Sequence, residues 1–167
     1  MAESKEKLST AANTAGPELV LTRVFDAPRN LVFAAWTEPE HLERGQGAPR
    51  GFTVTTHEVE IRPGGAYRIC MRSPEGVDLW LQGVYREVVR PERLVFTHSW
   101  LDTSGKPDQE TLVTITCTER GQKTEITLRQ TGFKSVESRD GHMLGWTSQL
   151  DGLAEYLAGD SAGPSRQ

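Results

Sequence analysis

The chain has 167 residues, of which 36% are hydrophobic and 25% are charged, and its formal net charge is −4. That length suits one domain, and the negative charge argues against nucleic acid as the main partner, because nucleic-acid binding usually needs a basic surface. No apolar run approaches the roughly 18 residues of a membrane-spanning helix, and residues 1–17 lack the apolar core of a secretory signal. We therefore expect no membrane insertion and a cytoplasmic location.

Both ends of the chain have the composition of unstructured segments. Residues 1–17 and 159–167 are rich in small and polar residues and poor in the apolar residues that a packed core requires. We expect a disordered N-terminal tail over residues 1–17, one domain over residues 18–158 and a flexible C-terminal tail over residues 159–167.

The domain begins with a strand and two short helices. Residues 19–25 are rich in β-forming residues and predict a strand. Asp26 is then a suitable N-cap and Pro28 suits a first helical turn, which predicts a helix starting at this point. Thr37 and the Glu-Pro-Glu that follows it predict a second short helix, which ends at Gly45.

From residue 52 onward, apolar and polar residues alternate, which predicts strands. Short turns separate the segments, so neighbouring strands should pair in antiparallel fashion. The expected strands cover residues 52–61, 66–72, 77–89, 94–100, 111–118 and 124–130. In the fourth of them, Leu94, Phe96, His98 and Trp100 share one face, which we expect to point inward.

A long amphipathic helix is expected over residues 138–158. Its apolar residues recur at three- and four-residue steps: Met143, Trp146, Leu150, Leu153 and Leu157. It is the one long amphipathic element available to cover a face of the sheet. The pattern therefore predicts an α+β fold, in which a curved antiparallel sheet of about six or seven strands wraps around a long C-terminal helix.

Three glycines weaken this helix, each by about 1 kcal/mol relative to alanine. Gly141, Gly145 and Gly152 fall on one line with Ser148, opposite the apolar stripe. Three interpretations remain open. The line is a plain solvent face, a close-approach surface for a loop or a second subunit (which would make a homodimer), or a row of small residues that widens a cavity.

Four segments together resemble a known family. They read LTRVFDAPRNLVFAAWTEPEHL (Leu21–Leu42), RPGGAYR (Arg62–Arg68), GVYREVVRPERLVFTHSW (Gly83–Trp100) and HMLGWTSQLDGLAEYL (His142–Leu157). They resemble the family named after the C-terminal domain of the activator of the heat-shock-protein-90 ATPase. That family belongs to the START-like, or SRPBCC, superfamily with the helix-grip fold.

The resemblance implies a cavity between the sheet and the C-terminal helix that binds a small hydrophobic or amphipathic ligand, such as a lipid. The strand faces and the two helices supply the residues that we expect to line it. These are Trp36, Tyr67, Ile69, Met71, Phe96, His98, Trp100, Val113, Ile115, Leu128, Met143, Trp146 and Leu150.

The sequence departs from the family at two places. Members often carry adjacent tryptophans after the second short helix, whereas this chain reads ERGQGAP at Glu43–Pro49. The cochaperone itself has a further N-terminal domain, whereas a short tail precedes the domain here. A chaperone-related interaction module remains an alternative function. Without the further domain, we expect the chain to stimulate the ATPase of heat shock protein 90 weakly or not at all.

An enzyme of the same superfamily, such as a cyclase, dehydratase or hydrolase, is another alternative. It would use His98, since a neutral imidazole in an apolar cavity can orient a ligand or act as a general base. A core histidine with paired nitrogens is the competing interpretation. The sequence contains no recognised nucleophile motif or phosphate-binding loop, so no catalytic residue is assigned.

The cysteines point to a structural role. Cys70 and Cys117 lie in two different expected strands, and without an export signal both should be reduced and buried. Neither has a metal-ligand partner at the usual spacing, so we expect no metal site, and no cofactor is predicted.

Overall fold

The computed structural model describes residues 16–38 and 51–162. Four expectations therefore lie wholly or mostly outside the described residues: the N-terminal tail apart from its last two residues, the second short helix, the stretch Glu43–Pro49, and the C-terminal tail from residue 163 onward. No helix in the described part of the chain is both long and apolar enough to cross a membrane.

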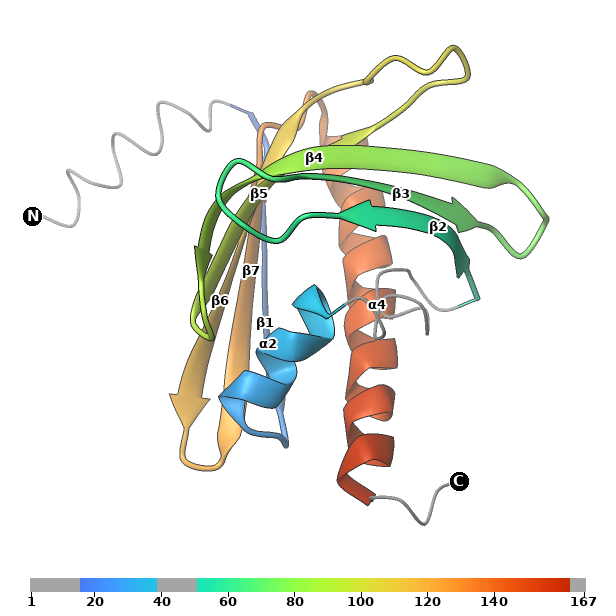
Figure 1. Ribbon diagram of the computed structural model, residues 1–167. Coiled ribbons are helices and arrows are strands. Elements are labelled where there is room, and N and C mark those ends of the chain that lie inside the picture. The colour runs from blue at the N-terminus through green and yellow to red at the C-terminus, as the bar shows by residue number, and fades with distance from the viewer. Residues whose placement is uncertain (1–15, 39–50, 163–167) are drawn as a thin grey trace, which may run out of the picture.

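The described chain forms the predicted α+β helix-grip fold (Figure 1). Its elements are β1 (Leu19–Phe25), α2 (Arg29–Thr37), β2 (Thr53–Val59), β3 (Ala66–Arg72), β4 (Asp78–Val89), β5 (Arg93–Trp100), β6 (Thr111–Arg120), β7 (Lys123–Thr131) and α4 (Val136–Ala162). The bounds of β1 and β3 coincide with the predicted ones, and the other strands differ from the prediction by one or two residues at an end.

The seven strands form one antiparallel sheet in the order β1-β7-β6-β5-β4-β3-β2. Figure 1 shows that β2, β3 and β4 arch over the upper part of α4, while α2 lies between the lower part of the sheet and that helix. The pairing of β4 with β5 shifts register between Tyr85 and Glu87. A bulge of this kind bends a strand and increases its twist, which accounts for the arch.

The core lies between the sheet and the two helices. Val113, Ile126 and Leu128 on β6 and β7 are completely buried, and Leu150 and Leu153 on α4 are nearly so. The register that the alternation predicts is therefore correct, because a slip of one residue would have turned these side chains to the outer face. Cys70 and Cys117 are buried and unbridged, as expected.

The predicted N-cap at Asp26 is wrong. Helix α2 begins at Arg29, and Pro28 stands at the N-cap position with an extended backbone and no side-chain cap hydrogen bond. A proline disfavours helical backbone angles in the residue before it, so Ala27 cannot start a helix. Thr37 is the last residue of α2, and its hydroxyl donates to the Phe33 carbonyl at 3.1 Å. The second short helix that Thr37 was expected to cap lies outside the described residues.

Helix α4 is longer than predicted at both ends. The hydroxyl of Ser135 accepts the backbone N–H of Ser138 at 3.0 Å, which is an N-cap contact and explains the start at Val136. At the other end the helix continues to Ala162, so residues 159–162 of the expected flexible tail are helical. Arg23 of β1 donates to the carboxylate of Asp151 at 2.5 Å and links the edge of the sheet to this helix.

Glycine at position 83, in the middle of β4, allows a close approach between two strands. Gly83 pairs with Tyr67, whose hydroxyl reaches past β4 to donate to the carbonyl of Thr97 on β5 at 2.7 Å. A Cβ atom at position 83 would collide with that carbonyl oxygen and would lie 2.5 Å from the Tyr67 ring. Glycine within a strand often marks such a contact.

We expect Gly83→Ala to lower the free energy of unfolding by about 2–3 kcal/mol, because the new methyl group must push the Tyr67 ring or β5 away. Urea denaturation measures the loss. Val84→Ala is the control, since Val84 is 40% exposed on the same strand and should change stability by less than about 1 kcal/mol. Equal stability of the two variants would contradict this account of β4.

Candidate functional site

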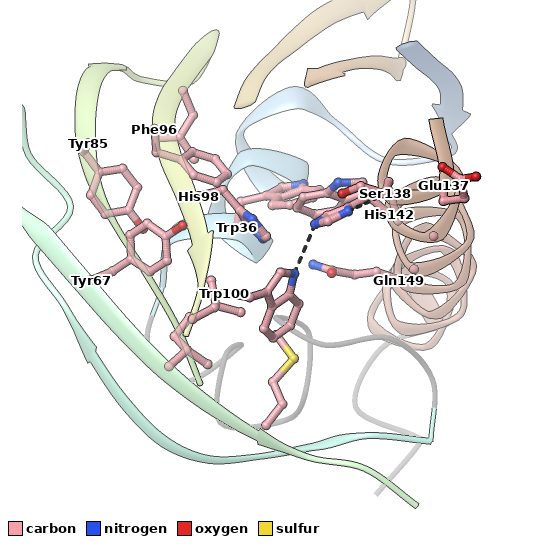
Figure 2. A pocket seen from close by; sticks show the side chains of 17 residues that line it. Trp36, Tyr67, Tyr85, Phe96, His98, Trp100, Glu137, Ser138, His142 and Gln149 are labelled. Carbon is pink, nitrogen blue, oxygen red and sulfur yellow. Dashed lines mark hydrogen bonds between the residues drawn. The ribbon is translucent and has the colours of Figure 1, made fainter. Parts of the chain in front are cut away.

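A cavity of about 370 Å³ lies between strands β3, β4 and β5 and the two helices (Figure 2). This volume falls within the range of small-molecule sites in proteins. Its wall consists of Trp36, Tyr67, Ile69, Met71, Leu81, Tyr85, Leu94, Phe96, His98, Trp100, Glu137, Ser138, Gly141, His142, Gly145, Trp146 and Gln149.

The structure divides the residues expected to line the cavity into two groups. Those on the wall are Trp36, Tyr67, Ile69, Met71, Phe96, His98, Trp100 and Trp146. Those away from it are Val113, Ile115, Leu128, Met143 and Leu150, which pack in or against the core. Helix α4 approaches the sheet most closely along β1, and α2 packs on β6 and β7. The strand residues of the cavity wall come from β3, β4 and β5.

The wall also contains residues that the sequence analysis did not include. Leu81, Tyr85 and Leu94 lie on inward strand faces, and alternation alone could have identified them. The other additions, all on α4, are Glu137, Ser138, Gly141, His142, Gly145 and Gln149. The apolar stripe of α4 faces the core as predicted, and these residues lie beside it on the helix, so the stripe alone did not assign them to the cavity.

The glycines of α4 are informative here. Gly141 and Gly145 line the cavity, and a Cβ atom built on either would meet nothing within 4 Å. Of the three interpretations, a row of small residues that widens the cavity fits Gly145, which is half-buried, whereas Gly141 is exposed and lies where the cavity meets solvent. Alanine would fit at both positions without a collision and would favour the helix.

His142 connects α4 to the sheet through both of its ring nitrogens. The indole N–H of Trp100 donates to Nε2 of His142 at 3.1 Å, and Nδ1 of His142 lies 2.8 Å from the Ser138 carbonyl oxygen (Figure 2). Because an indole nitrogen can only donate, Nε2 must accept and Nδ1 must carry the proton. In this arrangement both nitrogens of His142 are used in hydrogen bonds.

Unlike His142, His98 has a ring nitrogen without a hydrogen-bond partner. It is only 6% exposed, and its Nδ1 atom has no hydrogen-bond partner. Its ring lies in T-shaped contact with His142 and Trp100 and is tilted against Trp146, at centroid distances of 5.6–5.8 Å. Burial, and next the nearby His142, lower the pKa of His98 from 6.5 to about 3, so the imidazole is neutral at physiological pH.

A chain of buried hydrogen bonds runs beneath the cavity from helix to sheet. Trp146 on α4 donates to the side-chain oxygen of Gln130 at 2.7 Å, and Gln130 donates to the hydroxyl of Thr111 at 2.7 Å. That hydroxyl donates to the carbonyl oxygen of His98 at 2.9 Å. The chain links α4, β7, β6 and β5, and it satisfies each polar group on its way.

The remaining wall is aromatic and almost uncharged. Tyr67, Tyr85 and Phe96 form a cluster with ring centroids 5.4–5.8 Å apart, and Trp36 lies 6.0 Å from Trp146. Burial raises the pKa of Tyr67 and of Tyr85 well above the ordinary value, so both hydroxyls stay protonated. Among the described residues of the wall, Glu137 is the single Asp, Glu, Lys or Arg.

Comparison with known proteins gives a family and a set of related folds. A family model described as Activator of Hsp90 ATPase homolog 1-like protein matches residues 26–158. No curated protein matches the chain.

Several solved structures are similar over most of their length. One is an AHSA1 protein from Silicibacter pomeroyi, with 26% identity and a TM-score of 0.79 over 85% of this chain and 98% of that one. A protein from Chromobacterium violaceum has 27% identity and a TM-score of 0.75, covering 83% and 95%. A protein from Nitrosomonas europaea has 26% identity and a TM-score of 0.70, covering 87% and 96%.

We expect Trp146→Phe to lower the free energy of unfolding by about 1–3 kcal/mol, because it leaves the buried oxygen of Gln130 without a donor. The same substitution in a Gln130→Leu background should cost less, and a double-mutant cycle by urea denaturation gives the difference. Trp80→Phe is the control, since Trp80 is half-buried outside this chain of hydrogen bonds. Strict additivity of the two substitutions would contradict the assigned bond.

We expect His98 to make the protein less stable in acid. Below pH 6.5 the unfolded state binds a proton at His98, whereas the folded state does not bind it until about pH 3. Stability should therefore fall with decreasing pH in that window, by up to about 1.4 kcal/mol per pH unit from this group. Denaturation of the wild type and of His98→Phe at several pH values isolates the effect, and a constant difference between them would refute it.

Proposed function

This chain belongs to the Activator of Hsp90 ATPase homolog 1-like family, and from that premise we propose that it binds one small hydrophobic or amphipathic molecule in the cavity between the sheet and α4. The aromatic wall offers a large apolar surface that water solvates poorly. The volume of the cavity equals that of about 12 molecules of liquid water, at roughly 30 Å³ each.

The observation that carries this proposal is the pair of glycines on the cavity wall. Each glycine lowers helix stability by about 1 kcal/mol relative to alanine, and alanine would meet no atom within 4 Å at either position. A helix needed only for packing would be more stable with larger residues there. The lost stability is explained if the open space itself has a use.

The same wall supports binding rather than catalysis. A general base works best with a pKa near the operating pH, and the depressed pKa of His98 makes its imidazole a poor base. His142 has both nitrogens engaged in hydrogen bonds that hold the fold together. We therefore propose a ligand-binding role without a reaction.

We expect Gly145→Leu to abolish binding of 2-methylnaphthalene, because the leucine side chain would extend into the cavity. Stability should stay the same or rise by up to about 1 kcal/mol, since leucine favours a helix. Titration followed by methyl chemical shifts should move Ile69, Met71, Leu81 and Leu94 in the wild type and leave them unchanged in the variant.

Thr147→Leu is the matched control, because it adds the same side chain at an exposed position two residues further along α4. It should bind like the wild type. A second hollow lies across the sheet from the cavity, beside Thr97 and Ser99. Shifts confined to that hollow, or no binding at millimolar concentration, would contradict the proposal.

A further inference from the structure

The hydrogen-bonding groups of the cavity wall are mostly used within the protein. The Tyr67 hydroxyl and the indole nitrogens of Trp100 and Trp146 all donate to other protein groups. His142 uses both nitrogens, and the hydroxyl of Ser138 accepts from Gln109 at 2.7 Å. A ligand therefore finds few polar atoms with capacity left.

Among the groups that retain capacity, two are buried nitrogens. Nδ1 of His98 and Nε1 of Trp36 are buried side-chain nitrogens with no partner. Buried polar groups are rarely left unpaired, because losing hydration without a replacement costs about 1–3 kcal/mol. Figure 2 shows the His98 ring pointing into the space enclosed by Trp36, Trp100 and the His142 side of α4.

The charge of the wall restricts the ligand further. Its described residues include no lysine or arginine, and Glu137 is exposed at the edge. A carboxylate inside would lose its hydration without gaining a cation among the described residues of the wall. An ammonium group inside would be equally unpaired, because the Glu137 carboxylate lies at the edge.

The ring arrangement favours a flat molecule. Indoles and imidazoles of Trp36, Trp100, His98 and Trp146 surround one side of the space at centroid distances of 5.7–6.0 Å, and the Tyr67, Tyr85 and Phe96 rings lie on another. Aromatic groups gain from edge-to-face and offset contacts beyond their simple burial.

We infer that the ligand is an uncharged, flat aromatic compound that carries one hydroxyl group, with the hydroxyl bonded to His98, and that the cavity rejects the corresponding carboxylate. A hydroxyl group both donates and accepts, so it suits a neutral imidazole in either tautomer and also the N–H of Trp36. This inference rests on the proposed function, because it names the class of molecule for the same cavity.

Three probes with one ring system test it: 2-methylnaphthalene, 2-naphthol and 2-naphthoate. As a phenol, 2-naphthol stays protonated at pH 7.5, whereas the carboxylic acid is ionised. By calorimetry we expect 2-naphthol to bind about 5–10-fold more tightly than 2-methylnaphthalene, which corresponds to one hydrogen bond. It should bind at least about 100-fold more tightly than 2-naphthoate.

Variants at the wall separate the role of His98 from general packing. His98→Phe should remove the advantage of 2-naphthol over 2-methylnaphthalene, and His98→Gln should restore part of it, because an amide can donate and accept. Met71→Leu is the matched control on β3, since it changes the wall without changing its polar groups, and it should keep the full advantage.

The outcomes distinguish this inference from the proposed function. If 2-naphthoate or the cation 2-naphthylmethylammonium binds as tightly as 2-naphthol, the inferred ligand class is wrong, while cavity binding of 2-methylnaphthalene still supports the proposed function. If the advantage of 2-naphthol survives in His98→Phe, the assigned contact is wrong. If none of the probes binds in the cavity, both proposals fail.

Discussion

Two indole hydrogen bonds fix α4 over the sheet, and the cavity depends on both of them. Trp100 donates from the sheet to His142 on the helix, and Trp146 donates from the helix to Gln130 on the sheet. Because an indole is long and rigid, each bond sets a distance as well as a direction. With the helix held in this position, the absence of side chains at Gly141 and Gly145 leaves open space that neighbouring side chains do not fill.

The sequence was sufficient to predict the strands, their pairing and the long helix, because alternation and apolar periodicity are local properties. Val113 and Leu128 were correctly placed on the inward face for this reason, yet neither reaches the cavity. The sheet bends away from the helix at the bulge after Tyr85. The sequence around Leu128 contains no local pattern that would reveal this bend. Leu150 and Leu153 of the apolar stripe are buried as predicted, but the stripe meets the cavity wall only at Trp146, so the stripe alone did not identify the helix residues of the wall.

Several locally unfavourable features meet in one place. Glycines weaken a helix, unpaired imidazole nitrogens are costly to bury, and an open space forgoes dispersion contacts. Gly145, His98 and Trp36 each show one such feature, and all three lie on the same wall. Elsewhere the strand alternation and the hydrogen bonds of Gln130 follow the local rules, while Arg29 has a further buried nitrogen without a partner, away from this wall. Natural sequences tend to break local rules at functional sites, which supports assigning the function to this cavity.

The placement of the tryptophans has an optical consequence. Of the four in the chain, Trp36, Trp100 and Trp146 border the cavity, whereas Trp80 lies apart on β4 with the Arg68 guanidinium 4.7 Å from its ring centre. Indole emission shifts with the polarity and the ring neighbours of each chromophore. Exchange of water for an aromatic molecule would therefore alter three emitters and leave the fourth as an internal reference. The protein carries its own fluorescent reporter of cavity occupancy, with no label attached.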